Sequence, residues 1–178
     1  MTTPELQAVH TSVIDDDDAV RAVVQMCLEG EAEGDVGKLK QALHPDAWMF
    51  GELAGTRYDV PIQALFDMSA QAPADTGSYR SRILAVTCHG DVATATVAED
   101  GYWGTVSFLD LLSLCRIDGT WKIVNKTFAH LGATPPPDIA RWPRIAGPLR
   151  RAGLPARICA LPGLDRSATA RVSKSGAA

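Results

Sequence analysis

Apolar residues recur at helical spacing near the start of the chain. The stripe after Asp15 falls at i, i+3, i+4, i+7 and i+8, and consists of Val20, Val23, Val24, Cys27 and Leu28. This spacing predicts an amphipathic helix with one buried face. The acidic run of residues 15–18 supplies an N-cap and favourable first-turn charge. Gly30 and Gly34 weaken the C-terminal end of the helix.

The next segment predicts two more helices separated by a hairpin. A short helix with Val36, Leu39 and Leu43 inward stops before Pro45. Residues 47–60 have strand composition interrupted by glycines, which favours a short hairpin. Asp59 and Pro61 then resemble a cap and first-turn pair for a third helix. Its buried stripe is Ile62, Leu65, Phe66 and Ser69, and residues 71–77 form a loop.

From residue 78 the pattern changes to alternation of apolar and polar positions. Four such runs cover 78–90, 91–104, 105–119 and 120–131, and turn residues separate them, including the Asp118–Gly119 pair. Alternation of this kind predicts a meander of antiparallel strands joined by hairpins. Helices grouped apart from an antiparallel sheet define the α+β class.

Charge divides the chain into two parts. Residues 1–133 contain 9 Lys+Arg and 19 Asp+Glu, whereas residues 134–178 contain 8 and 2. We therefore predict a flexible leader at 1–14, a folded domain at 15–133, and a Pro/Arg-rich basic tail at 134–178 that is extended or disordered. The acidic body argues against nucleic acid as a partner.

Other function classes lack the sequence features that they need. No apolar run is long enough for a membrane span and no signal peptide is present, so we expect a cytoplasmic protein. The four cysteines form no CxxC pair, and no nucleotide, zinc-protease or serine-hydrolase motif occurs. We accordingly expect no metal and no cofactor.

The last run carries the residues best suited to chemistry. Strand alternation places Lys126, Phe128 and His130 on one face, together with Lys122 and Val124. A buried lysine has a lowered pKa and a histidine transfers protons near neutral pH, so this face could carry acid–base chemistry. Alternatively, Lys126 reaches the sheet edge or pairs with a carboxylate, and His130 caps the strand.

Asp110 is a second polar residue inside an apolar run. Its alternation is opposite to that of Ser113, which we assign to the cavity face. An uninterrupted strand places Asp110 on the other face, at a dimer interface, whereas a bulge would reverse the assignment. Burial of either kind predicts a polar partner for Asp110.

The order of these elements resembles the nuclear transport factor 2-like superfamily, which includes SnoaL-like proteins and ketosteroid isomerases. Within it the chain is most similar to the lumazine-binding subgroup. The resemblance covers roughly residues 18–131 and rests on the helix pair at 29–47, GDVATATV at 90–97 and the closing WKIVNK at 121–126. It implies a cone-shaped curved antiparallel sheet packed against three N-terminal helices, the cystatin-like α+β barrel. It also implies a ligand cavity between them, with Lys126, Phe128 and His130 on its wall.

The resemblance also bears on mechanism. The tyrosine, base and buried acid of steroid isomerases would fall on Cys27, Gly51 and near Ser113, so that mechanism is not expected here. Glu52, beside Gly51, remains an alternative candidate for the carboxylate base.

Two functions follow from these features. The first is a small-molecule pocket protein that acts as a cofactor-free isomerase, cyclase or lyase by proton transfer on a carbonyl-containing, largely apolar substrate. The second is a non-catalytic ligand-binding or protein-association module of the same fold. Both are expected as homodimers through the sheet, without nucleic acid or membrane partners. The catalytic candidates are His130, Lys126, Tyr102 and Asp110, and the ligand-binding candidates are Trp48, Phe50, Phe66, Tyr79, Phe128, Cys27 and Ser113.

Overall fold

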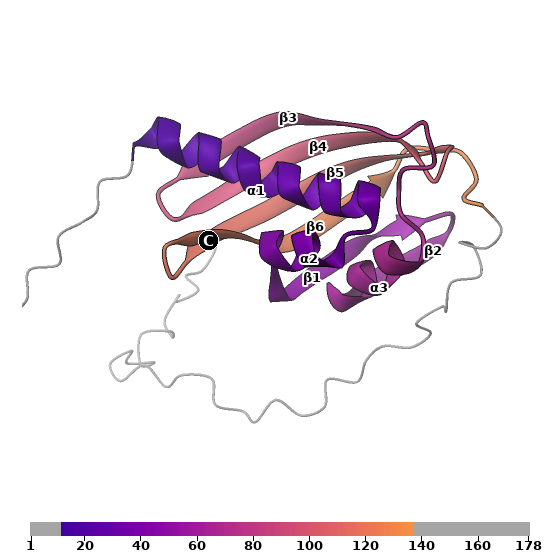
Figure 1. Cartoon of the computed structure of the whole chain (residues 1–178), viewed down its shortest axis with the longest axis horizontal. Helices are drawn as coiled ribbons and strands as arrows, with labels where there is room; N and C mark the ends of the chain where they lie inside the picture. Colours follow the sequence, from indigo (N-terminus) through magenta and orange to yellow (C-terminus); the bar gives the residue numbers. More distant parts are fainter. Residues whose placement is uncertain (1–11, 137–178) are drawn as a thin grey trace, which may run out of the picture. The chain divides into compact units, whose positions relative to one another are not determined.

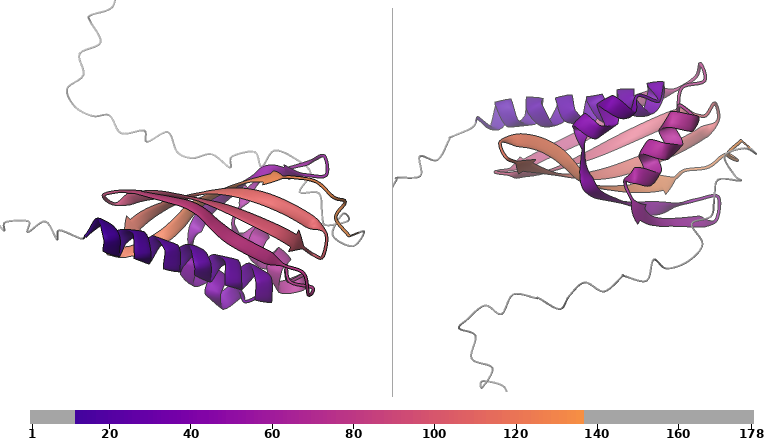
Figure 2. Two further views of the ribbon diagram at one scale, coloured as in Figure 1. Left: turned by 90° about the horizontal axis from the view of Figure 1, so that it is seen from above. Right: turned by 60° about the horizontal axis from the view of Figure 1, so that its bottom comes forward.

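The computed structural model describes residues 12–136, which form three helices and six strands (Figure 1). The helices are α1 (Val13–Glu33), α2 (Val36–Ala42) and α3 (Gln63–Gln71). The strands are β1 (Leu43–Leu53), β2 (Thr56–Pro61), β3 (Arg80–His89), β4 (Val92–Tyr102), β5 (Val106–Ile117) and β6 (Thr120–His130). All three helices cover one face of a single curved sheet (Figure 2), which confirms the α+β prediction.

The sheet combines a meander with one parallel pair. Its strand order is β2-β1-β6-β5-β4-β3, and β1 pairs with β6 in parallel while the other neighbours are antiparallel. Asp118 and Gly119 both have positive φ in the turn between β5 and β6, as a two-residue hairpin turn requires. The parallel pair brings the first strand beside the last, and thereby places both against the helices.

Helix α1 begins earlier than its acidic run suggests. Ser12 has an extended backbone and its side chain accepts a hydrogen bond from the Ile14 N–H at 3.2 Å, so Ser12 is the N-cap. The predicted cap within residues 15–18 is therefore wrong, and these aspartates lie inside the helix. Gly34 ends the helix in the left-handed conformation at φ 71°, as the glycine pattern indicates.

The start of α3 also differs from the prediction. Asp59 and Pro61 belong to β2, and the Asp59 carboxylate accepts a hydrogen bond from the Trp48 indole N–H at 2.8 Å. Ile62 precedes the helix without any side-chain cap. The hairpin thus ends one residue later than expected, at Pro61, because Asp59 and Pro61 pair with Phe50 and Trp48 on β1.

A bulge in β6 changes which side chains share a face. The register between β5 and β6 shifts so that Ile123 and Asn125 pair with consecutive residues, which leaves Val124 as the extra residue. Trp121 and Ile123 are buried before the bulge and Lys126 is buried after it. The prediction that Lys122 and Val124 share a face with Lys126 is therefore wrong.

The core consists of two clusters. The larger one packs the predicted stripe of α1 against the inner face of the sheet, including Val20, Val24 and Leu28. The smaller one is aromatic and contains Tyr102, Trp103 and Phe108 near the turn between β4 and β5. Among the described residues, no helix is long and apolar enough to cross a membrane.

Two of the predictions from sequence concern residues outside 12–136. Most of the leader and nearly all of the basic tail lie there, beyond the described part of the chain. Of the tail, Thr134 accepts a hydrogen bond from the Thr105 hydroxyl at 3.3 Å and Pro135 is buried.

Candidate functional site

A pocket lies between the two core clusters. About 30 Å³ of it is available to the centres of water-sized molecules, within about 370 Å³ of space between atoms that includes open solvent. Its apolar lining consists of Met49, Leu53, Tyr58, Leu65, Met68, Trp103, Phe108 and Phe128, and its polar lining consists of Glu31, Glu99, Tyr102, Asp110 and Lys126. Leu53 and Trp103 adjoin the β1–β2 and β4–β5 turns, so the pocket lies toward the end of the sheet at which both turns are found (Figure 1).

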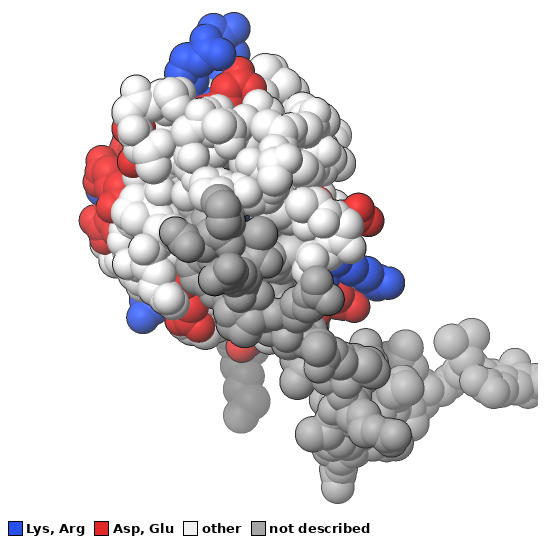
Figure 3. Space-filling view, turned by 90° about the vertical axis from the view of Figure 1, so that its right-hand side faces the viewer, with Lys and Arg blue, Asp and Glu red and all other residues white. Residues whose placement is uncertain are grey.

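Figure 3 shows this end of the molecule from outside. Uncharged residues cover most of its described surface, and Lys, Arg, Asp and Glu stand at its margins. An uncharged surrounding and an apolar lining suit a largely apolar ligand.

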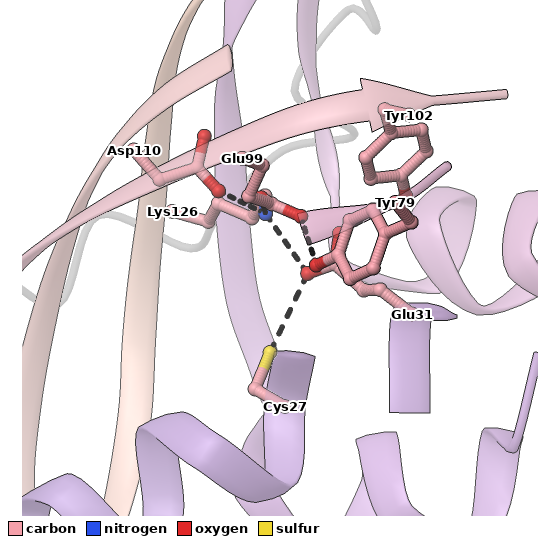
Figure 4. Close-up of polar contacts among 7 residues, drawn as sticks. All are labelled: Cys27, Glu31, Tyr79, Glu99, Tyr102, Asp110 and Lys126. Carbon is pink, nitrogen blue, oxygen red and sulfur yellow. Dashed lines mark hydrogen bonds and ion pairs between the residues drawn. The ribbon is translucent and has the colours of Figure 1, made fainter. Parts of the chain in front are cut away.

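A charged cluster forms the polar side of the pocket (Figure 4). The Lys126 ammonium donates to Glu31 Oε1 at 2.8 Å and to Asp110 Oδ2, and Glu99 Oε1 lies 3.5 Å from the same nitrogen. Lys126 is 5% exposed and the three carboxyl residues are 1% exposed. One buried cation therefore faces three buried carboxyl groups, an arrangement that folding alone does not favour.

Each member of the cluster reaches the pocket from a different element. Glu31 lies on α1, three residues after Leu28 and four after Cys27, and so continues the buried stripe. Glu99 continues the inward alternation of Ala95 and Val97 on β4. Both carboxyl groups were missed in the sequence analysis, although extending these two periodic patterns would have identified them.

Asp110 and Ser113 exchange the positions that were predicted for them. Phe108, Asp110 and Leu112 are buried on β5, whereas Ser113 is exposed on the opposite side of the strand. No bulge intervenes between residues 108 and 113, so the error lies in the choice of inward face.

Hydroxyl groups hold two of the carboxylates in place. The Tyr102 hydroxyl donates to Glu31 Oε2 at 3.0 Å, and the Tyr79 hydroxyl donates to Glu99 Oε2 at 2.6 Å. The Cys27 thiol donates to Glu31 Oε1 at 3.5 Å. Glu31 thus accepts from three side chains and is the most fully satisfied carboxylate of the cluster.

Two carboxyl oxygens have no donor among the described residues. Glu99 Oε1 and Asp110 Oδ1 are buried and accept no hydrogen bond. Burial, followed by the nearby Asp110 carboxylate, raises the pKa of Glu99 to about 8, although Lys126 opposes this rise. A proton held between Glu99 and Asp110 would satisfy both groups, as in other carboxyl pairs that share one proton.

The electrostatics of Lys126 differ from the prediction. Burial by itself would lower the pKa of the ammonium, but Asp110, Glu31 and Glu99 outweigh burial and hold the pKa well above its usual value. Lys126 is therefore a fixed positive charge near neutral pH, and the predicted shift toward the acid–base range is wrong. Burial also raises the pKa of Glu31, opposed by Lys126 and the Tyr102 hydroxyl.

The remaining pKa directions follow the same causes. Burial, followed by Glu31, raises the pKa of the Cys27 thiol and of the Tyr102 hydroxyl. Burial and Glu99 raise the pKa of Tyr79. These groups are therefore neutral donors near pH 7.

The structure brings together part of the predicted site. Lys126, Tyr102, Asp110 and Phe128 line the pocket, and Tyr79 and Cys27 bond to its carboxylates. Their predicted roles in catalysis or binding stay predictions.

Other predicted site residues lie elsewhere. Trp48 and Phe50 flank the inward Met49 on β1 and so face away from the pocket, and Phe66 is buried in the core on α3. His130 packs its ring 5.8 Å from that of Phe108 and does not line the pocket, contrary to the prediction for the cavity wall. The reason is its position at the end of β6, beyond the lining residue Phe128.

Metal ligation finds no support in residues 12–136, where no group of three or more His, Cys, Asp or Glu side chains is arranged to hold an ion. Lys126 occupies the centre of the carboxyl cluster instead (Figure 4).

Comparison with known proteins identifies the family. Residues 15–129 match the family described as "Putative lumazine-binding". The chain belongs to this family. Its wider membership in the nuclear transport factor 2-like superfamily is confirmed by an NTF2-like protein of unknown function from Methylobacillus flagellatus KT, which is 32% identical with a TM-score of 0.62. That alignment covers 70% of this chain and 98% of the other.

Two further relatives extend the comparison. A protein named aldolase FrzH from Cladobotryum sp is 26% identical over 111 residues, which are 62% of this chain and 88% of that protein. A cystatin-like fold protein from Burkholderia xenovorans LB400 is 17% identical with a TM-score of 0.54, covering 68% of this chain and 95% of that one. The latter confirms the cystatin-like fold, and the family as a whole supports a ligand-binding or enzymatic fold.

Proposed function

We propose that this family member catalyses proton transfer next to a carbonyl group, without a cofactor, in its apolar pocket. The observation that carries this proposal is the Glu99–Asp110 carboxyl pair beside the Lys126 ammonium at the pocket wall. A carboxyl group with a pKa of about 8 is mostly protonated at pH 7 and half ionised at about pH 8, so it can take and return a proton close to neutrality, which suits a general base. The fixed positive charge of Lys126 suits stabilisation of an oxyanion.

The proposed reaction begins at the carbon next to the carbonyl. The Glu99 carboxylate takes the proton, the C–H electron pair forms a C=C bond, and the carbonyl π electrons move to oxygen. The Lys126 ammonium, whose contact with Glu99 is long at 3.5 Å, stabilises the resulting enolate. Protonated Glu99 then returns its proton at another carbon in an isomerisation.

Carbon–carbon bond formation uses the same first step. In an aldol reaction the enolate carbon attacks a second carbonyl carbon, and protonated Glu99 gives its proton to the new alkoxide. The relative named as an aldolase supports a reaction of this lyase type. His130 has no part in this mechanism because it does not line the pocket.

The first prediction tests the role of Glu99. Carbonyl compounds with an apolar body should exchange their α-hydrogens for deuterium in D₂O when the protein is present, as followed by NMR. The rate should rise with pH, with its midpoint at about 8, because the ionised base accumulates as pH passes the pKa of Glu99. Glu99→Gln should lower the rate about a hundredfold, since the amide cannot accept the proton.

Asp100→Asn is the matched control for this variant. Asp100 is the next residue on β4, is exposed, and faces the other way, so its replacement removes a carboxyl group from the same strand without touching the pocket. Equal exchange by wild type and Glu99→Gln would remove Glu99 from the mechanism. Loss of exchange in His130→Ala alone would assign the base to His130 instead.

A further inference from the structure

Two buried carboxyl oxygens of the cluster accept no hydrogen bond from the described residues. The Lys126 ammonium already donates to Glu31 and Asp110, and the Tyr79 and Tyr102 hydroxyls donate to carboxylates. The Trp103 indole N–H, also at the pocket, donates to the Ala72 carbonyl at 3.0 Å. What stays open are Asp110 Oδ1 and Glu99 Oε1. A ligand group that reaches these two oxygens must therefore present hydrogen-bond donors.

The charge of the wall favours a cation over a neutral donor. Lys126 can neutralise one of the three carboxyl groups, and no other Lys, Arg or His lines the pocket among residues 12–136. The remaining two carboxyl groups are balanced only by protons in this part of the chain. A ligand cation can replace such a proton, whereas an anionic ligand would meet like charge.

The apolar wall is also suited to a cation. Five aromatic rings line the pocket, those of Tyr58, Tyr102, Trp103, Phe108 and Phe128. Aromatic faces attract ammonium groups, and the attraction grows where water is excluded. The same rings supply the apolar contact area for the rest of a ligand.

We propose that the substrate of this site is a carbonyl compound that carries a protonated amine on an apolar body. Its ammonium group donates hydrogen bonds to Asp110 Oδ1 and Glu99 Oε1 and displaces the proton that this pair shares. The inference rests on the proposed function, because it names the substrate class of the same site. It adds that substrate binding itself ionises the pair and so prepares Glu99 as the base.

Binding should therefore exchange a cation for a proton. Glu99 is neutral in the free protein below its pKa of about 8, so amine binding at about pH 7 releases close to one proton. The release falls toward zero above about pH 9, while an alkylamine stays protonated to about pH 10. The groups that face Glu99 and set this balance are Glu31 and Cys27 on α1, Tyr79 before β3, Tyr102 on β4, Asp110 on β5 and Lys126 on β6.

The experiment compares three probes of one shape by isothermal titration calorimetry. They are 2-phenylethylamine, 2-phenylethanol and phenylacetate, which are cationic, neutral and anionic. Titrations of the wild-type protein in phosphate and in Tris buffer measure the protons released. The amine should bind at least tenfold more tightly than the alcohol, with close to one proton released at about pH 7. Equal binding of amine and alcohol, tighter binding of the carboxylate, absence of amine binding, or binding without proton release would overturn the inference.

Variants separate the pair from general surface charge. Glu99→Gln should abolish the proton release and weaken amine binding about tenfold, whereas Asp100→Asn should change neither. Unchanged proton release in Glu99→Gln would contradict the assignment to this pair.

The inference and the proposed function can fail separately. Deuterium exchange on a neutral aryl ketone, with no preference for amines, would support the proposed function and overturn the inference. Selective amine binding with proton release, but no exchange on any amino ketone, would support the amine site and overturn the proposed reaction.

Discussion

Single hydrogen bonds set the proton affinity of the cluster. Glu99 is buried among carboxylates, which raises its pKa, and the Tyr79 hydroxyl opposes this rise by donating to the ionised form. Tyr79 does not line the pocket, so it acts on the reaction only through Glu99. It is a positioning residue whose contribution should be visible in a pH profile.

Tyr79→Phe should raise the pKa of Glu99 further, because the ionised carboxylate loses a donor. A neutral hydrogen bond is worth about 1 kcal/mol, so the midpoint of the exchange rate should move up by roughly 0.5 to 1 pH unit. The pH profile of deuterium exchange measures this shift. Tyr58→Phe is the control, since the Tyr58 hydroxyl makes no bond to the cluster, and its profile should keep the wild-type midpoint. A downward shift in Tyr79→Phe would contradict the assigned direction.

At the scale of elements, the β1–β6 pair shapes the pocket. Gly51 pairs in register with Phe128, and a Cβ placed at Gly51 would lie 2.6 Å from three ring atoms of Phe128. Gly51 is the position where resemblance to steroid isomerases would place the base. The Phe128 ring fills the space beside it, which explains physically why no side chain is present there.

Gly51→Ala should destabilise the fold by about 1–3 kcal/mol, because the methyl group overpacks against the ring. Urea unfolding measures the free energy. Phe128→Leu should cost stability on its own, but the double variant should be more stable than the sum of the two single changes implies. Additive effects of the two substitutions would show that Gly51 and Phe128 do not compete for this space.

At the scale of the whole molecule, the uncovered face of the sheet is the expected dimer interface. Phe50 on β1, Thr127 on β6 and Leu111 on β5 are register neighbours on the side away from the helices. Phe50 is 36% exposed and Leu111 is 54% exposed. Two exposed large apolar side chains in one row of a sheet face are suited to contact with a second copy of the chain.

Leu111→Lys should therefore weaken a homodimer by about tenfold or more, because a charge would be desolvated at the interface. Sedimentation velocity at several protein concentrations measures the association, and circular dichroism checks that the monomer stays folded. Leu84→Lys, at an exposed position on the edge strand β3, should leave the association unchanged. A wild-type protein that sediments as a monomer at micromolar concentration would overturn the prediction.

Much of the fold and part of the site follow from local patterns. The stripe from Val20 to Leu28 predicts a buried helix face, the Asp118–Gly119 pair predicts a hairpin, and the four alternating runs predict the meander. Glu31 and Glu99 occupy buried positions of the same periodic patterns. Because both residues are charged, hydrophobicity by itself does not mark these positions as buried. These features depend on contacts between near neighbours, so the sequence by itself determines them.

Other features depend on residues far apart in the chain. The parallel pairing of β1 with β6 and the bulge at Val124 decide that Lys126 faces the pocket. Asp110 and Glu31, which are 16 and 95 residues away from Lys126, decide that Lys126 keeps its charge although burial opposes it. Periodicity shows that a side chain is buried but not which charge it meets. The tertiary structure alone decides that, because the energy of a buried charge is set by the groups within a few ångströms of it.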